Sequence, residues 1–362
     1  MMRSSGPDPF QKSNALGMSA GSVAPEATSS PPGDERTCRR GVDQFCAAFG
    51  VPDFLSPWLD RFFEEADVNV VLALAEGPLT MGALCERVPS LSTQDVERLH
   101  RRGVVDALSD GTVTRADFHA RFEVWAVLEG WKDVPDDVRA ELNLWEQRRY
   151  EERKRPQIEA LRAGAVPSPH LENSEYLLLH EAEALLERVD RFYLWPCNCR
   201  AMMGACNMPA NVCIRFTNER GIGWEISRER AREIIRQANK AGLMRTGEVA
   251  EVDGRVVGAL CNCCVDCCYP HLVTKRLGAE KLWPLSRYVA RHDVGRCTAC
   301  GKCVRRCPFG AFVSGSPVTS GRGGPARPEI VLDTDLCRGC GVCATECPEE
   351  AIAMDPLTSR GL

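Results

Sequence analysis

Two runs of four cysteines near the end of the chain share one spacing. They are Cys297, Cys300, Cys303 and Cys307, followed by Pro308, and Cys337, Cys340, Cys343 and Cys347, followed by Pro348. A single Cys-x2-Cys pair also occurs in zinc sites and in redox dithiols. Two complete Cys-x2-Cys-x2-Cys-x3-Cys-Pro runs in tandem are instead typical of the ligands of two [4Fe–4S] clusters. The sequence therefore predicts that the cysteines of both runs bind iron.

The residues between and after these cysteines suit short turns around a cluster. Gly301 and Gly341 occupy equivalent places, where a side chain would crowd the cluster and a positive φ is often required. We expect each proline to end the short helical turn that carries the fourth cysteine. The apolar segments 309–313 and 351–354 are predicted to pack against the clusters, and residues 329–333 to form a strand before the second run.

Residues 290 to 356 resemble the bacterial-type ferredoxins with two clusters, which have an α+β fold with pseudo-twofold symmetry. The resemblance implies that each cluster takes its fourth thiolate from the other run. Cys347 would complete one cluster, and Cys307 would complete the other. The chain departs from the compact form in the Gly-, Pro- and Ser-rich segment 314–328, for which we predict a solvent-facing loop. A tolerated insertion explains this loop more simply than a docking function does.

A second group of cysteines lies in the middle of the chain. Its nine members are Cys197, Cys199, Cys206, Cys213, Cys261, Cys263, Cys264, Cys267 and Cys268. A predicted helix over 227–241 and a predicted hairpin turning at Asp253–Gly254 separate the two halves of the group. This small unit could bring the halves together, so residues 170–285 are interpreted as a Cys-rich, metal-binding domain.

Three interpretations of the middle cysteines are open. They could hold a further iron–sulfur cluster, with Cys197 and Cys199 joined by members of the second half. They could hold zinc, for which the tetrahedral set Cys197, Cys199, Cys206 and Cys213 is available. They could also be buried free thiols that behave as small apolar side chains. The adjacent cysteine pairs provide more thiols than one site needs, which favours a cluster with spare thiols for an unusual cluster or a bound substrate.

Two residues beside the middle cysteines are candidates for tuning a metal centre. His271 could bind the metal or tune its potential, or it could simply cap or solvate the end of a loop. Arg200 could offset the negative charge of a cluster, or it could be an ordinary surface arginine.

The motifs Cys197-Asn-Cys199-Arg200 and Cys261-Asn-Cys263-Cys264 resemble those of a loosely defined group of iron–sulfur proteins. That group joins a winged-helix-like N-terminal region, a Cys-rich centre and a two-cluster ferredoxin tail. The resemblance implies electron transfer in anaerobic or redox metabolism, and it names no reaction.

The first part of the chain has a different composition. Residues 1–37 are rich in Ser, Pro and Gly and are predicted to be a disordered tail. Residues 38–165 are predicted to be helical and winged-helix-like. Their expected elements are a helix over 54–75, a helix over 81–87 capped by Thr80, a helix ending at Arg102 capped by Ser92 or Thr93, a hairpin turning at Asp110–Gly111, and charged helices over 119–165. A linker over 164–169 and an amphipathic helix over 174–189 follow.

The predicted fold class is therefore α+β and multidomain, with a ferredoxin-like domain over 290–362 as its last part. The net charge of −5 gives no nucleic-acid signature, and the helix ending at Arg102 has a mixed-charge face, so DNA is an unlikely partner. An acidic chain is expected to approach basic patches on a redox partner. The 20 cysteines and the lack of an apolar leader favour a reducing cytoplasm. The longest apolar run, 68–75, is too short for membrane insertion.

The leading hypothesis is an electron-transfer protein. Electrons would pass through two [4Fe–4S] clusters to or from the Cys-rich centre and a partner oxidoreductase. One alternative is a redox enzyme whose middle centre performs the chemistry, and another is a redox-responsive DNA-binding regulator. No dinucleotide-binding glycine motif, phosphate-binding loop or Ser-His-Asp signature occurs in the sequence, so a flavin or nicotinamide is not expected.

Overall fold

The computed structural model describes residues 34–165, 175–252, 254–318 and 327–357. Most of the predicted tail and of the predicted linker lies outside these ranges. Helix α1 (Asp34–Phe49), however, begins inside the segment that was predicted to be a tail. Among the described helices, none has both the length and the apolar character needed to cross a bilayer.

The region after α1 contains short helices and a small sheet. Its elements are η1 (Asp53–Trp58), α2 (Leu59–Phe62), α3 (Glu65–Ala73), β1 (Leu79–Thr80), α4 (Met81–Arg87), α5 (Thr93–Arg102), β2 (Val105–Ala107) and β3 (Thr112–Arg115). The strands pair antiparallel in the order β1-β3-β2, and β2 and β3 form the hairpin that was predicted. The side-chain oxygen of Thr80 accepts the Ala83 N–H at 3.3 Å. That of Ser92 accepts the Asp95 N–H at 3.2 Å, so α4 and α5 begin where the sequence predicts.

The single helix predicted over 54–75 is wrong. Its apolar residues are divided among η1, α2 and α3, and the chain is extended at Phe63 and Glu64. Asp67 explains the break, because its Oδ2 accepts the backbone N–H of Glu64 at 2.8 Å and starts a new helix with a capping box. The Asp67 side chain is buried and also accepts Arg102 Nη1 at 2.8 Å, which ties α3 to α5.

A long helix joins the first half of the chain to the middle. The helices predicted over 119–165 are largely present, in α6 (Phe118–Val124), the π-helical turn η2 (Trp125–Glu129) and α7 (Asp136–Arg162), but residues 130–135 and 163–165 are not helical. On α7, Tyr150 packs against Trp283 with ring centroids 6.1 Å apart. One continuous apolar core therefore extends from α1 to Trp283, across the predicted boundary near residue 165. The domain boundaries stay a prediction.

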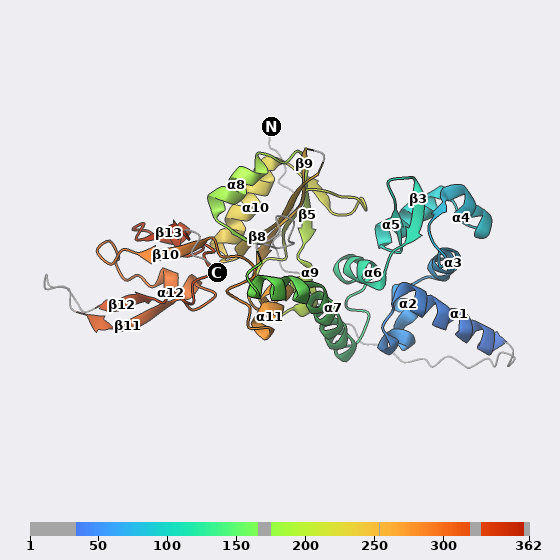
Figure 1. Ribbon diagram of the computed structural model, residues 1–362, viewed down its shortest axis with the longest axis horizontal. Coiled ribbons are helices and arrows are strands. Elements are labelled where there is room, and N and C mark those ends of the chain that lie inside the picture. Colours follow the sequence, from blue (N-terminus) through green and yellow to red (C-terminus); the bar gives the residue numbers. More distant parts are fainter. Residues whose placement is uncertain (1–33, 166–174, 253, 319–326, 358–362) are drawn as a thin grey trace, which may run out of the picture.

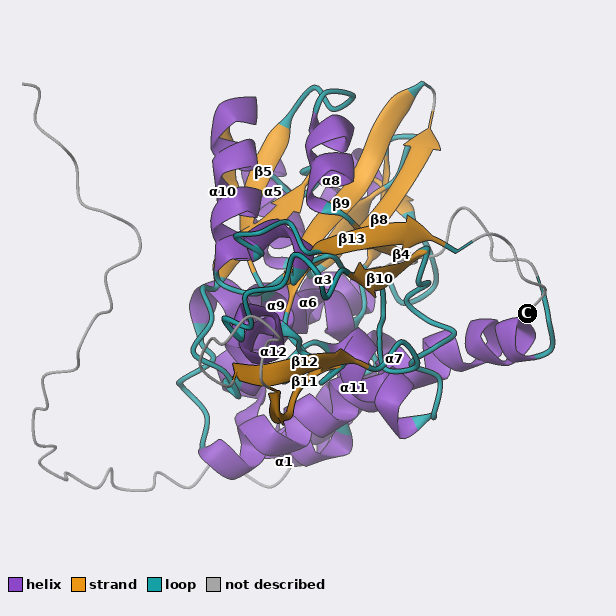
Figure 2. Ribbon diagram, turned by 90° about the vertical axis from the view of Figure 1, so that its left-hand side faces the viewer, coloured by secondary structure: helices purple, strands orange, loops and turns teal. Residues whose placement is uncertain are grey.

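Six antiparallel strands form the central sheet. In sheet order they are β4 (Glu175–Leu177), β8 (Met244–Val252), β9 (Arg255–Cys263), β6 (Asn211–Arg215), β5 (Phe192–Pro196) and β7 (Trp224–Ile226). Helices α8 (Leu179–Leu186) and α10 (Arg228–Lys240) pack side by side against the sheet (Figure 1) through a core that includes Ile235 and Leu260. The long strands β8 and β9 stand beside these helices (Figure 2), and together with α10 they confirm the predicted helix and hairpin.

The helix predicted over 174–189 is only partly present. Residues 175–177 form β4, because their backbone pairs with β8 and the N–H of Tyr176 donates to the oxygen of Leu285 at 3.1 Å. Helix α8 begins only at Leu179, after Glu181 Oε2 accepts the N–H of Leu178 at 2.8 Å.

The last part of the chain contains two small two-stranded sheets. Strand β10 (Tyr288–His292) pairs with β13 (Ile352–Pro356), and β11 (Phe312–Val318) pairs with β12 (Arg327–Leu332). Helix α12 (Lys302–Arg306) lies between the two sheets (Figure 1), and the 3-10 turn η3 (Ala344–Glu346) lies within the second cysteine run, between Cys343 and Cys347. The strand predicted before that run is present as β12.

The loop predicted over 314–328 is wrong at both of its ends. Residues 314–318 belong to β11 and residues 327–328 belong to β12, while residues 319–326 lie outside the described part of the chain. The pairing shifts between Ser314 and Pro317 and then continues to Val318. A bulge at this point accommodates the Gly-Ser-Pro sequence that made the segment resemble a loop.

Candidate metal centres

Three cysteines of the first run converge with the last cysteine of the second run. The four side chains of Cys297, Cys300, Cys303 and Cys347 line one small cavity. Ile330 and Ile352 form part of its apolar wall. Cys303 is buried and Cys300 is exposed, so this site reaches the surface. This set combines three cysteines of the first run with the last cysteine of the second run. The resemblance to two-cluster ferredoxins implies the same combination.

The remaining four cysteines of the two runs form a more deeply placed set. Burial raises the pKa of Cys340 to about 12, and the charges of Cys307 and Cys337 contribute to the shift. Burial also raises the pKa of Cys343, which interacts with the same three cysteines. Cys307 from the first run therefore lies with the first three cysteines of the second run. Cys340 and Cys343 are both buried, in contrast to Cys300.

The backbone around the two sets repeats with twofold symmetry. The sulfurs of four cysteines accept backbone N–H groups: Cys297 from Ala299 at 3.4 Å, Cys337 from Gly339 at 3.5 Å, Cys307 from Ala311 at 3.3 Å, and Cys347 from Ala351 at 3.3 Å. Such N–H groups stabilise anionic sulfur and tune the potential of a cluster. Converging thiolates, apolar walls and N–H donors fit the requirements of iron–sulfur clusters.

Six of the nine middle cysteines form a closed ring. In order around the ring they are Cys197, Cys213, Cys261, Cys263, Cys268 and Cys199, and each thiol interacts with its two neighbours. They come from the junction of β5 with α9 (Asn198–Met203), from β6, from the end of β9, and from the start of α11 (Tyr269–Arg276). This group, named the six-thiol ring, lines one side of a large cavity.

The thiols of the ring stabilise anionic sulfur among themselves. Hydrogen bonds from Cys197 and Cys261 hold the pKa of Cys213 well below its ordinary value. Hydrogen bonds from Cys261 and Cys268 do the same for the pKa of Cys263. The same interactions and burial raise the pKa of the other four ring thiols. Cys213 and Cys263 are therefore the members favoured as thiolates, the form of cysteine that binds metal.

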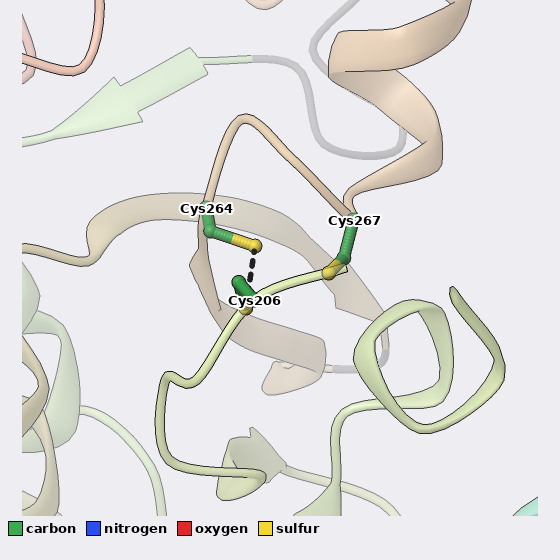
Figure 3. A group of neighbouring side chains, drawn as sticks. All are labelled: Cys206, Cys264 and Cys267. Atoms are coloured by element: carbon green, nitrogen blue, oxygen red, sulfur yellow. Dashed lines mark hydrogen bonds between the residues drawn. The ribbon is translucent and has the colours of Figure 1, made fainter. Parts of the chain in front are cut away.

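The other three middle cysteines form a separate group. The sulfurs of Cys206, Cys264 and Cys267 all lie within 4.8 Å of one another, and those of Cys206 and Cys264 are 3.7 Å apart. Figure 3 shows the three side chains pointing toward one point from two loops. Three thiolates are one fewer than a tetrahedral zinc site requires. The zinc set predicted from the sequence is divided by the structure, which groups Cys206 with Cys264 and Cys267 rather than with Cys197 and Cys213.

Arg200 lies between the two middle groups. It is only 4% exposed, so its interpretation as an ordinary surface arginine is wrong. Its guanidinium donates to the backbone oxygens of Pro209 and Asn262 and interacts with both Cys197 and Cys264. A buried cation at this position offsets the negative charge that thiolates from both groups bring.

His271 is also buried, which excludes its interpretation as a solvated loop end. It lies in the first turn of α11 and stacks on Tyr176 with ring centroids 5.9 Å apart. Its Nδ1 is 3.4 Å from the Tyr176 hydroxyl, whereas its Nε2 has no hydrogen-bond partner among the described residues. The ring of Phe309 lies 6.1 Å from His271 and 6.0 Å from Tyr176.

These three aromatic rings connect the two cysteine-rich regions. Tyr176 is 1% exposed, and its hydroxyl interacts with Cys340 of the second run and with Cys268 and Cys263 of the six-thiol ring. Burial and these three thiols raise the pKa of Tyr176 well above its ordinary value. No sequence pattern selects Tyr176, because it lies far from the second run and from Cys263 and Cys268 along the chain.

Comparison with known proteins identifies the class of one part of the chain. Residues 296–352 match the family model described as the 4Fe-4S dicluster domain. No curated protein and no solved structure matches the chain. The chain therefore carries a C-terminal 4Fe-4S dicluster domain, which supports iron–sulfur clusters. Together with the cysteine group in the middle, this domain indicates an iron–sulfur redox protein.

A glycine in the second run provides a test of the dicluster geometry. At Gly339, φ is +66° and a Cβ would lie 2.2 Å from the backbone oxygen of Tyr288. Gly339→Ala is expected to displace β10 from the second run and to lower the free energy of unfolding by about 1–3 kcal/mol. Chemical denaturation and iron content measure the effect.

The equivalent position in the first run supplies the control. Ala299 already has a φ of 56°. Ala299→Gly would relieve the strain of this conformation, which stabilises the folded state, and it would also give the unfolded chain more conformational freedom. These two opposing effects on the free energy of unfolding are of similar size. It is expected to leave stability within about 1 kcal/mol of the native protein. A Gly339→Ala variant as stable and as rich in iron as Ala299→Gly would contradict the packing described for β10.

Proposed function

We propose that the chain transfers electrons between a redox partner and a metal centre held by the six-thiol ring, by way of the dicluster domain. The observation that carries the proposal is the position of Tyr176, whose buried ring packs with Cys340 of the second run and stacks on His271 of α11, the helix that begins beside Cys268. When bound, each cluster of the dicluster domain would take up and release one electron.

The proposed ligands follow the grouping of the thiols. One cluster would be held by Cys297, Cys300, Cys303 and Cys347, and the other by Cys337, Cys340, Cys343 and Cys307. For the six-thiol ring we favour an iron–sulfur centre over zinc, because six converging thiols exceed the four that a single zinc ion takes. The buried Arg200 supports an anionic centre of this kind.

The contact between the two parts is held by buried polar groups as well as by aromatic rings. Arg245 is fully buried and donates to the backbone oxygens of Leu177 at 3.2 Å and of Cys340 at 3.4 Å. Asn239 on α10 donates to Thr345 Oγ1 at 2.8 Å. Because these bonds cross from the central sheet to the second run, the separation between Cys340 and the six-thiol ring is fixed by packing.

Electron paramagnetic resonance of the full chain, purified without oxygen and reduced with dithionite, tests the proposal. We expect a signal from the six-thiol centre that is split by spin coupling to the cluster of the second run. A Cys263→Ser, Cys268→Ser double variant should lose the middle signal and the splitting, and it should keep both cluster signals.

Cys85→Ser is the matched control, because Cys85 on α4 belongs to neither cysteine group. It should leave the spectrum unchanged. A native spectrum that is the simple sum of two isolated clusters, with no contribution from the middle thiols, would exclude the proposed path.

We propose that the redox partner presents an acidic surface to the first cluster site. Lys302, Arg305 and Arg327 are exposed cations near the exposed Cys300. The site also holds Arg296, which pairs with Glu350 at 3.3 Å, and the exposed Glu349. Arg305 donates to the oxygen of Cys300 at 3.4 Å, and Arg327 to that of Thr298 at 3.3 Å. Lys302, Arg305 and Arg327 outnumber Glu349, the carboxylate left after Glu350 pairs with Arg296, so the local charge is opposite to the net charge of −5. In place of the basic partner surface expected from the net charge, we therefore propose an acidic one.

Stopped-flow reduction by an acidic two-cluster ferredoxin measures this interaction. Lys302→Glu and Arg305→Glu together should slow the second-order rate roughly tenfold or more at low salt, because rim charges act mainly on association. The control is a second double variant with the same change of charge, Arg188→Glu just after α8 and Arg232→Glu on α10. It should leave the rate unchanged. Equal rates for all three proteins, or a rate that rises with salt, would contradict an acidic partner.

For residues 65–115 we propose a winged-helix fold with a scaffolding role. The element order α3, β1, α4, α5, β2, β3 supports the fold. Two arginines of α5 are engaged within the protein, since Arg98 pairs with Glu64 at 2.8 Å and Arg102 with Asp67. The Nε2 of His100 meets the backbone oxygen of Glu219 at 3.1 Å, so α5 packs on the middle region instead of being free to enter a DNA groove.

A gel-shift screen with reduced and with oxidised protein, on the DNA upstream of its own coding sequence, tests this role. We expect no shift in either state at physiological salt. A specific shift in one redox state would instead support a redox-responsive regulator.

A further inference from the structure

The six-thiol ring faces an open chamber. The six sulfur-bearing side chains form one wall of a cavity that holds about 1300 Å³ of space, its mouth to solvent included. This is ample for a metabolite-sized ligand. An electron carrier needs no chamber beside its metal centre, because electrons cross packed protein. The space therefore calls for a second explanation.

Proton-carrying groups from α6 and α7 also line the chamber. His119 on α6 and Glu146 on α7 are joined by a contact of 2.9 Å between Nδ1 and Oε2. Glu123, one turn after His119, accepts Asn198 Nδ2 at 2.7 Å and lies 3.9 Å from Arg215. None of these residues is among the cysteine ligands proposed above, and the electron-transfer proposal gives them no role.

The charges around His119 favour its protonated form. Burial disfavours the imidazolium, but the hydrogen bond to Glu146 and the charges of Glu123, Glu146 and Asp117 outweigh burial and raise the pKa of His119. Burial raises the pKa of Glu146 as well. For Glu123, burial is outweighed by His119 and Arg215, which lower its pKa and keep it anionic. The pair of His119 and Glu146 therefore retains a proton that it can donate.

The charged groups of the chamber nearly cancel. The cations are His119, Arg153 and Arg215, and the carboxylates are Glu123, Glu146 and Glu248. Trp195, on which Arg215 lies with its guanidinium 4.4 Å from the ring centroid, adds an aromatic surface. The charges of these six side chains cancel, and a centre held by thiolates is itself anionic, so the chamber disfavours an anionic ligand. A metal held by thiolates favours a soft donor atom in the ligand.

We propose that the chamber is an active site in which a small uncharged molecule is reduced, with its soft end toward the six-thiol centre and its other end toward His119. The inference rests on the proposed function, which supplies the electrons from a low-potential partner. The overall change is S + 2e⁻ + 2H⁺ → SH₂. His119 donates one proton to the substrate and is reprotonated from solvent at the chamber mouth before it donates the second.

His119 acts here as a proton donor, and the groups that face it are known from every packed element. Asp117, Glu123 and Glu146 act on His119 directly. The neighbours of these two glutamates are Arg149 and Arg153 on α7, Arg215 on β6 and Tyr269 at the start of α11. Glu146 positions the imidazole, because its carboxylate accepts from Nδ1 and leaves Nε2 as the other donor.

One neutral and one anionic probe test the chamber in the reduced full chain. n-Butyl isocyanide is an uncharged soft donor, and thiocyanate is an anionic one. We expect the isocyanide to change the paramagnetic signal of the six-thiol centre and to leave the two dicluster signals as an internal control, while thiocyanate at the same concentration has little effect. No response to the isocyanide, or a response to thiocyanate alone, would overturn the proposed ligand class.

The pH dependence of the midpoint potential of the six-thiol centre tests the role of His119. In the native chain the potential should fall as pH rises, because reduction takes up a proton that becomes scarcer. His119→Gln should flatten this slope, and Glu146→Gln should reduce it, with iron content equal to native showing that both variants fold. His180→Gln, an exposed histidine on α8 outside the chamber, should keep the native slope.

The outcomes separate this inference from the electron-transfer proposal. A middle signal that is insensitive to both probes and to pH would leave an electron carrier without an active site. A chain with no middle signal at all would remove both proposals together.

Discussion

Tyr176 occupies the position on which the arrangement of the cysteine-rich parts depends. Its ring is buried among Cys340, Met244, Val342 and Phe309, and it stacks on His271. Strand β4 holds it there by pairing with β8, while Arg245 holds the facing backbone of the second run. If this packing were loose, the dicluster domain would be a separate module on a tether. Because it is tight, the second run would be the inner end of the proposed electron path, and the exposed first run would be its outer end.

The two ends of that path differ in solvent access and charge. Around Cys300 the surface is open and basic, although the chain as a whole is acidic. Around the six-thiol ring the thiols are buried or half-buried, and a buried arginine offsets their charge. The chamber adds hard, protonatable groups to a soft, sulfur-lined wall. An outer surface suited to a protein and an inner chamber suited to a small molecule are what a reductase fed by a partner would require.

Local sequence patterns predicted most of the helices and strands near the metal sites. They did not predict the cysteine grouping and the site residues that depend on contacts between distant parts of the chain. The caps at Thr80 and Ser92, helix α10 and the β8–β9 hairpin follow from neighbouring residues alone. The division of the middle cysteines into a group of six and a group of three does not follow from neighbouring residues. It is set by the strand order β9-β6-β5 in the sheet. This order places Cys213 beside Cys261 and leaves Cys206 in a loop. Tyr176, His119 and Glu146 were missed for the same reason, since no motif marks a residue whose role comes from its neighbours in space.

Iron, acid-labile sulfide and zinc per chain, measured on protein purified without oxygen, test the central claim most directly. Two [4Fe–4S] clusters account for about eight irons, so an additional iron–sulfur centre in the six-thiol ring predicts about twelve or more, without stoichiometric zinc. About eight irons and no zinc would mean that only the dicluster domain is metallated. About eight irons with one zinc would make the middle centre structural, and either result would contradict an iron–sulfur centre in the six-thiol ring.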